Sequence, residues 1–137
     1  MSLVLDASMA IAWMFEDEHT PSVLAALQRV ASEGAIVPSL WRLEVANALR
    51  TAVRRQRCPD DYADDHLRRL GRLSIDVDSE TDVHAWGKTR AISREEDLTL
   101  YDAAYLELAL RGGYPLASNH RDLLAAARRR GVDALGA

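Results

Sequence analysis

Short, mostly apolar runs alternate along the chain with longer segments in which apolar residues recur at helical spacing. Five runs are too short for a helix and predict strands, at residues 3–5, 35–38, 74–77, 115–117 and 132–135, of which we expect the first two to be buried. In the longer segments apolar residues recur every three or four positions, as from Val23 to Ala31, which predicts amphipathic helices. Strands and helices that alternate in this way are typical of a parallel sheet covered on both faces. The pattern therefore predicts an α/β fold.

Polar residues that favour helix starts refine these predictions. We expect Thr20 to cap a helix that begins at Pro21. We also expect Ser39, Ser79 and Thr99 to cap helices, with the Ser79 helix running to about residue 92. The last predicted helix spans residues 119–130, and no segment has the composition of a linker or a repeat.

Composition places limits on the class of protein. The chain has 137 residues, a formal net charge of −4, 48% hydrophobic residues and 28% charged residues, which predicts one folded domain over residues 1–137. The single cysteine, Cys58, excludes an internal disulfide and favours a reducing compartment. We expect a cytoplasmic protein without a signal peptide or membrane segment, because every apolar run is too short to span a bilayer.

Three acidic residues lie where a parallel sheet binds ligands, just after a strand or in the opening turns of a helix. They are Asp6, Glu44 and Asp102. Each also has a structural explanation: Asp6 as a helix N-cap, Glu44 as a favourable charge near a helix N-terminus, and Asp102 as the capping-box partner of Thr99. The apolar spacing of the Glu44 helix predicts that this residue borders a buried face, formed by Leu40, Leu43, Ala46 and Leu49.

Three carboxylates at one sheet edge suit a hard divalent cation. Mg²⁺ and Mn²⁺ prefer oxygen ligands, and Mg²⁺ usually takes one or two carboxylates, several waters and substrate phosphate oxygens. Such an ion activates water and stabilises charge during phosphoryl displacement. The residues therefore predict a Mg²⁺ or Mn²⁺ site for phosphate chemistry.

Four segments of the chain resemble, in order, the motif blocks of PIN-domain proteins of the VapC toxin type. They read VLDASMAIAW, PSLWRLEVANAL, LTLYDAAYLELALRGGYPLAS and DLLAAARRRGV. The resemblance covers almost the whole chain and implies a compact three-layer α/β/α domain with a short, mostly parallel sheet. It also implies a Mg²⁺- or Mn²⁺-dependent endoribonuclease, a small cognate antitoxin protein as partner, and a homodimer.

Matched by position, Asp6, Glu44 and Asp102 correspond to the first three acids of the family, and Ser8 to its usual Ser or Thr. His120 stands where the family usually has a fourth acid, which puts a second metal in doubt. As a neutral imidazole, His120 would be a ligand for Mn²⁺, and as a protonated one it would bind phosphate. The explanation without a function is that His120 is an ordinary surface histidine in the first turn of a helix.

Two further acids are candidates for this site. Asp122 is a possible substitute ligand, although its spacing from Asn119 suits helix capping. We expect Glu107 on a solvated helix face.

Arginine dominates the basic residues, because Lys88 is the only lysine among 17. Coding bias explains this composition, and so does a phosphate-binding surface. Residues 40–57 carry five arginines and one acid, from which we select Arg42, Arg50 and Arg54 as candidate RNA contacts. The same residues suit an acidic antitoxin tail.

Three functions follow from the sequence. The first is a ribonuclease toxin with Asp6, Glu44 and Asp102 as catalytic metal ligands. The second is a degenerate PIN domain that binds RNA or an antitoxin without cleaving. The third is an unrelated doubly wound domain in which Asp6 is a nucleophile or phosphoacceptor.

Overall fold

A computed structural model describes residues 2–136 and contains a five-stranded sheet in which every pairing is parallel. The strand order is β3-β2-β1-β4-β5. The strands are β1 (Leu3–Leu5), β2 (Ala35–Val37), β3 (Ile75–Val77), β4 (Leu116–Ala117) and β5 (Ala134–Leu135). The predicted α/β class is confirmed.

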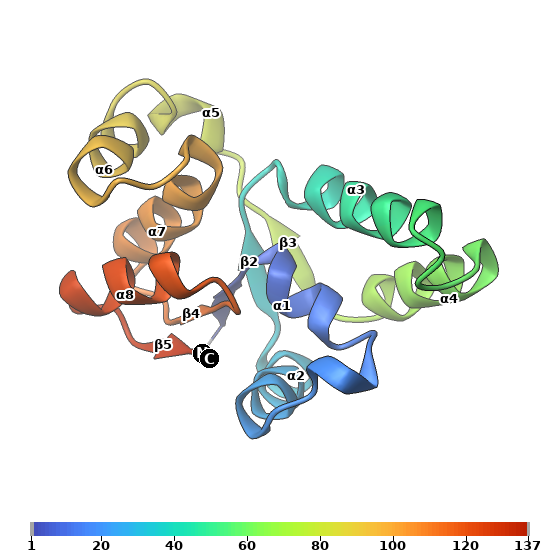
Figure 1. Cartoon of the computed structure of the whole chain (residues 1–137). Coiled ribbons are helices and arrows are strands. Elements are labelled where there is room, and N and C mark those ends of the chain that lie inside the picture. The colour runs from blue at the N-terminus through green and yellow to red at the C-terminus, as the bar shows by residue number, and fades with distance from the viewer. Residues whose placement is uncertain (1, 137) are drawn as a thin grey trace.

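Helices cover both sides of this sheet (Figure 1). The group containing α6, α7 and α8 lies on the left in Figure 1, and the group containing α1, α3 and α4 lies on the right, so the fold has three layers. The helices are α1 (Ala7–Ala12), a 3-10 helix (Glu16–Glu18), α2 (Pro21–Glu33), α3 (Trp41–Arg54), α4 (Asp60–Gly71), α5 (Thr81–His84), α6 (Lys88–Glu96), α7 (Leu100–Gly112) and α8 (Arg121–Arg129). None of the helices within residues 2–136 combines the length and apolarity that crossing a membrane requires.

Two of the predicted helix caps are confirmed and two are wrong. The hydroxyl oxygens of Thr20 and Thr99 accept backbone N–H groups at the starts of α2 and α7. Ser39 does not cap α3; its backbone N–H donates to the hydroxyl of Thr81. Ser79 does not cap α5, which begins after Glu80, and the helix predicted to reach residue 92 is interrupted before α6. At Ser39 the loop after β2 is bound to the start of α5 instead of being closed by a local serine cap.

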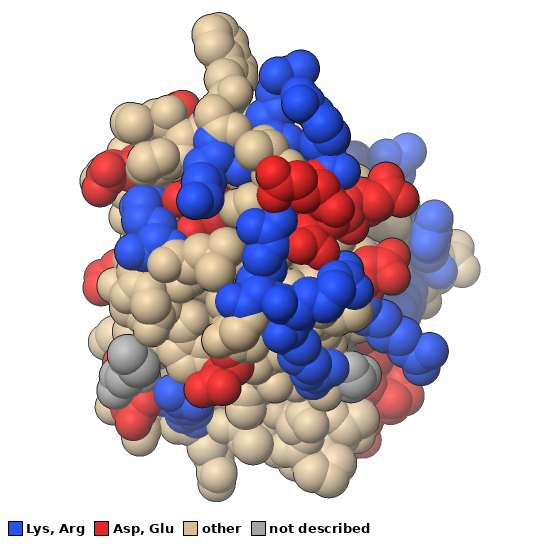
Figure 2. Space-filling view, turned by 90° about the vertical axis from the view of Figure 1, so that its left-hand side faces the viewer, with Lys and Arg blue, Asp and Glu red and all other residues tan. Residues whose placement is uncertain are grey.

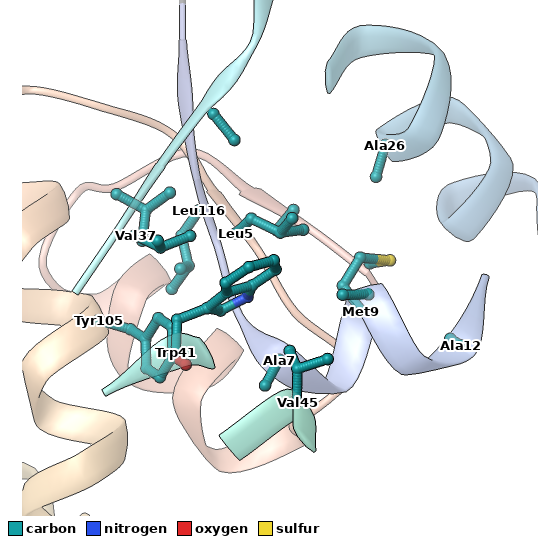
Figure 3. Close-up of a cluster of buried hydrophobic side chains, with 14 of the residues drawn as sticks. Leu5, Ala7, Met9, Ala12, Ala26, Val37, Trp41, Val45, Tyr105 and Leu116 are labelled. Atoms are coloured by element: carbon teal, nitrogen blue, oxygen red, sulfur yellow. The ribbon is translucent and has the colours of Figure 1, made fainter. Parts of the chain in front are cut away.

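The core forms where α1, α3 and α7 pack against the sheet (Figure 3). Its members include Leu5, Ala7, Met9, Val37, Trp41, Val45, Tyr105 and Leu116. The face of α3 predicted from Leu43 is wrong, because Leu43 is 76% exposed whereas Trp41 is buried. The helix turns its Trp41 side inward because the indole has more apolar surface to bury.

The order of the strands determines where a ligand site lies. The chain passes from β1 to β2 and β3 on one side of the sheet and then forms β4 and β5 on the other, so the direction reverses between β1 and β4. Val4 pairs with Leu116 and Leu5 with Ala117. Residues that follow β1 and β4 therefore meet at the topological switch point, where open α/β sheets bind ligands.

Gly34 joins α2 to β2 in a conformation that favours glycine. Its φ is 80° and its ψ −177°, and an added Cβ would lie 2.8 Å from the carbonyl oxygen of Ser74. We expect Gly34→Ala to lower the free energy of unfolding by about 2–3 kcal/mol, because this backbone region is almost restricted to glycine. Urea unfolding followed by circular dichroism measures the change.

Gly71→Ala is the matched control, since nothing lies within 4 Å of a Cβ added at that helical glycine. We expect it to be neutral or to stabilise by up to about 1 kcal/mol. Equal stabilities of Gly34→Ala and wild type would contradict the role of this turn.

Candidate active site

Asp6 follows β1 and is 4% exposed. Its Oδ2 accepts hydrogen bonds from the hydroxyls of Ser8, on α1, and Ser118, after β4, both at 2.6 Å. Asp6 occupies the N-cap position of α1 but its side chain makes no capping hydrogen bond, so the capping explanation is wrong. The two hydroxyls compensate part of the cost of burying a carboxylate and hold it at the switch point.

The two serine hydroxyls also organise the segment that enters α8. The Ser8 oxygen accepts the backbone N–H of Asn119 at 2.9 Å, and the Ser118 oxygen accepts that of His120 at 2.9 Å. Ser8 therefore connects Asp6 to the N–H of Asn119, and Ser118 connects it to the next N–H along the chain. This network determines where His120 stands.

Glu44, on α3, is half-buried and accepts a short hydrogen bond from the hydroxyl of Tyr105, on α7. Tyr105 is fully buried in the core, so the Glu44 carboxylate is positioned by a rigid donor. Burial raises the pKa of Glu44, and the charges of Asp6 and Asp102 raise it further, while the Tyr105 hydrogen bond acts in the opposite direction.

Asp102 lies in the first turn of α7. Its backbone N–H donates to the Thr99 hydroxyl at 3.1 Å, which is the capping interaction expected from the sequence. Its Oδ2 lies 3.2 Å from Nδ1 of His120, whose side chain is 46% exposed. Burial raises the pKa of Asp102; the nearby His120 lowers it, and the charge of Asp6 raises it.

These side chains face one cavity of about 490 Å³. Its lining includes Asp6, Ser8, Glu18, Glu44, Arg57, Asp102, Asn119 and His120. In the described part of the chain, none of the three predicted metal ligands forms an ion pair with Lys or Arg. The cavity thus holds converging negative charge.

The donors of the cavity fit a divalent cation held partly through water. No group of three or more acidic, His or Cys side chains within residues 2–136 is arranged tightly enough to hold a metal ion alone. Mg²⁺ usually binds one or two carboxylates and retains several waters, so a looser set of oxygens is compatible with it. Mutual repulsion of the carboxylates contributes to the raised pKa of Glu44 and of Asp102, and a bound cation would relieve this repulsion.

Asp122 and Glu107 lie outside the cavity. Asp122 is exposed in the first turn of α8 and does not line the cavity. The expectation for Glu107 is wrong: it is 4% exposed and accepts from Arg111 at 2.8 Å, and Arg111 also binds Asp78 at 2.7 Å. Because its partner Asp78 follows β3, no local signal announced this buried ion network.

The candidate RNA contacts Arg42, Arg50 and Arg54 are exposed on α3 and do not line the cavity. The arginine run at the end of α8 does not form a purely basic surface either, because Arg130 binds Glu95 at 2.6 Å and Glu96 at 2.7 Å. Figure 2 shows acidic and basic side chains interleaved on the face that lies on the left in Figure 1.

Four residues around the site were not among the selected candidates: Glu18, Arg57, Tyr105 and Ser118. For Ser118 a signal existed, since a hydroxyl that follows β4 lies beside the end of β1. For Tyr105 it did not, because an apolar helix face gives no indication that one of its hydroxyls reaches an acid.

Comparisons with known proteins agree on the fold. The PIN domain family model matches residues 3–129. The crystal structure of PAE2754 from Pyrobaculum aerophilum has a TM-score of 0.71 and 24% identity, and the match covers 98% of this chain and 83% of that one. VapBC2 from Rickettsia felis, bound to a DNA fragment from its promoter, has a TM-score of 0.67 and 14% identity, covering 100% and 99%.

FitAcB from Neisseria gonorrhoeae has a TM-score of 0.66 and 13% identity, with coverage of 97% and 96%. No curated protein matches the chain in sequence. At these identities the solved structures establish the architecture alone.

The charge repulsion in the cavity predicts that Glu44→Gln stabilises the metal-free protein. The amide keeps an acceptor for the Tyr105 hydroxyl and removes a half-buried charge. We expect the free energy of unfolding at pH 7 in EDTA to rise by about 0.5–2 kcal/mol, as measured by urea titration. Because the folded-state pKa of Glu44 is raised, the gain belongs to pH values above that pKa and is lost as the pH falls through it.

Glu107→Gln is the matched control, since it alters a buried acid that already has a cation beside it. We expect it to lower the free energy of unfolding by about 1–3 kcal/mol. A Glu44→Gln variant that is destabilised as much as Glu107→Gln would contradict the repulsion argument.

Proposed function

Because the chain belongs to the PIN-domain family, we propose that it is a divalent-metal-dependent endoribonuclease and the toxin of a type II toxin–antitoxin pair. One observation carries the proposal. Asp6, Glu44 and Asp102 reach the same cavity at the switch point of the sheet, without a Lys or Arg partner in the described chain. Acids arranged in this way suit a cation and a phosphate substrate.

The proposed reaction is hydrolysis of an RNA phosphodiester bond, in which a water oxygen bonds to phosphorus and the bond to the leaving sugar oxygen breaks. Asp6, Glu44 and Asp102 would hold Mg²⁺ or Mn²⁺, directly or through water. The bound ion would lower the pKa of the attacking water and neutralise phosphate charge. Ser8 and Ser118 fix one oxygen of Asp6, and Tyr105 fixes one oxygen of Glu44.

The proposed partners are RNA, a small antitoxin protein and a second copy of the chain. The motifs that resemble VapC toxins and the fold shared with VapBC2 support the antitoxin. Exposed apolar side chains support the dimer: Leu43, Trp86 and Tyr101 surround a cavity of about 740 Å³ near the starts of α3 and α7, and Trp86 is 91% exposed. Arg42, Arg50 and Arg54, exposed on α3, are proposed to contact RNA backbone outside the cavity.

The test is metal-dependent cleavage by purified protein that is free of antitoxin. We expect wild type to cleave a labelled structured RNA with Mn²⁺ and to lose cleavage in EDTA. Asp6→Ala should lower the rate by at least about 100-fold, because Asp6 would hold the ion that activates water. Asp65→Ala, which removes an exposed acid on α4, is the charge-matched control and should cleave at the wild-type rate. Undiminished cleavage by Asp6→Ala would overturn the assignment.

A second candidate function rests on His120, which stands where the family usually has an acid. In this alternative the protein binds RNA or an antitoxin without cleaving it. His120 already contacts Asp102 and lines the cavity, so an acid at this position would add an oxygen ligand directly at the site.

His120→Asp distinguishes the two functions. If wild type is an active nuclease, we expect the variant to bind Mn²⁺ about 10-fold more tightly by calorimetry, with cleavage changed less than affinity. If wild type is inactive and His120→Asp cleaves RNA, the natural protein is a binding protein. Equal Mn²⁺ affinity of the two proteins would remove His120 from the metal site.

A further inference from the structure

Arg57 lines the acidic cavity, in a position set by the end of α3. Gln56 has a positive φ of 61°, and its N–H donates to the carbonyl of Val53 at 3.0 Å, while the Arg57 N–H donates to the carbonyl of Ala52 at 2.8 Å. These bonds form a Schellman motif, which normally uses glycine at the left-handed residue. The chain therefore accepts an unfavourable backbone conformation immediately before Arg57.

The guanidinium of Arg57 lies over an aromatic ring. Its Cζ lies 3.6 Å from the ring centroid of Phe15, which is buried. One nitrogen donates to Glu18 at 2.8 Å, and another donates to both oxygens of Asp17 at 3.1 and 3.0 Å. Stacking occupies the face of the guanidinium and leaves its N–H groups directed outward along the edge, where they bind oxygen acceptors.

The lining of the cavity is strongly acidic, so a protein cation beside it would favour the approach of a phosphate. Four carboxylates line it, because Glu18 joins Asp6, Glu44 and Asp102. One divalent ion compensates two of these charges, so an incoming phosphate would still meet net negative charge. Arg57 is the only Lys or Arg among the described residues that line the cavity.

The acidic partners of Arg57 are replaceable. The side chain of Asp17 is 75% exposed and that of Glu18 is 33% exposed, while Arg57 itself is 40% exposed. Ion pairs with this much exposure add little to stability, so exchanging a carboxylate for a phosphate costs little. A phosphate presents the same paired oxygen acceptors to the guanidinium fork.

We propose that Arg57 is the residue that binds the RNA backbone phosphate at the mouth of the cavity, releasing Asp17 and Glu18 as it does so. This inference rests on the proposed ribonuclease function and deepens it. Arg42, Arg50 and Arg54 lie outside the cavity and would contact phosphates farther along the strand. Until RNA arrives, Asp17 and Glu18 occupy the donors that the phosphate will use.

The test is RNA affinity as a function of salt concentration, measured by fluorescence anisotropy with a labelled single-stranded oligoribonucleotide. The titrations contain Ca²⁺ in place of Mn²⁺, and a gel verifies that the RNA stays intact. We expect Arg57→Ala to weaken binding about 10-fold, since hydrogen bonds to charged groups are the strong ones. Affinity decreases with salt, and the steepness of log affinity against log salt concentration should decrease by about 0.7, the value for one lost phosphate contact on a single strand. Arg57→Lys should restore the slope and part of the affinity, because it keeps the charge without the fork.

Arg68→Ala is the matched control. It removes an exposed arginine from α4 whose partner is a single carboxylate, Asp65, and we expect affinity and slope close to wild type. Thermal unfolding of each variant verifies that the fold is kept. An Arg57→Ala variant with wild-type affinity and slope, an equal loss in Arg68→Ala, or a wild type that does not bind RNA would overturn the proposal.

Cleavage with Mn²⁺, measured on the same variants, separates this proposal from the ribonuclease assignment. If wild type binds RNA through Arg57 but does not cleave it, the nuclease function fails and the role of Arg57 stands. If wild type cleaves and Arg57→Ala has unchanged KM and kcat, the role of Arg57 fails and the nuclease function stands. We expect KM to rise more than kcat falls.

Discussion

The site depends on one buried carboxylate and the two hydroxyls that donate to it. Asp6 stands at the point where the sheet reverses its strand order, and Ser8 and Ser118 bring α1 and the end of β4 to the same oxygen. A buried charge without such donors would be costly, so the hydrogen bonds make the position tolerable. The hydroxyl oxygens in turn accept the N–H groups of Asn119 and His120, and the direction of the chain into α8 follows from them.

Two acidic clusters in this protein show how differently carboxylates are used. Glu107 and Asp78 share Arg111, which lowers the pKa of Asp78 and ties the end of α7 to the loop after β3. Glu44 and Asp102 have no arginine, and burial raises the pKa of both. The first cluster is electrostatically complete and structural. The second has no such cation beside it among the described residues, and unrelieved repulsion of this kind is more common at functional sites than in structural ion networks.

Much of the fold can be predicted from the local sequence pattern. The predictions that are wrong concern residues whose positions depend on tertiary contacts. The strands, the caps at Thr20 and Thr99 and the grouping of three acids near one edge depend on short-range features that the sequence displays directly. Ser39 is not a cap because α3 begins one residue later, after Leu40, and the Ser39 N–H binds Thr81, a residue 42 positions away. Leu43 has the right spacing for the core, but α3 buries the face that carries Trp41 and leaves Leu43 exposed, since the indole has more apolar surface. Glu107 is buried only because Arg111 and Asp78 meet it, and periodicity does not report such partners.

The hydrogen bond between Ser118 and Asp6 joins residues 112 positions apart. During synthesis the first strand emerges from the ribosome long before the fourth, so Asp6 lacks the Ser118 hydroxyl, and the cavity lacks Asn119 and His120, until residues 118–120 have been translated. The candidate site is therefore completed by a segment that is translated 112 positions after the carboxylate it holds. A ribosome that stalls before residue 118 would leave a chain without the complete network, so the order of the strands itself delays formation of the site.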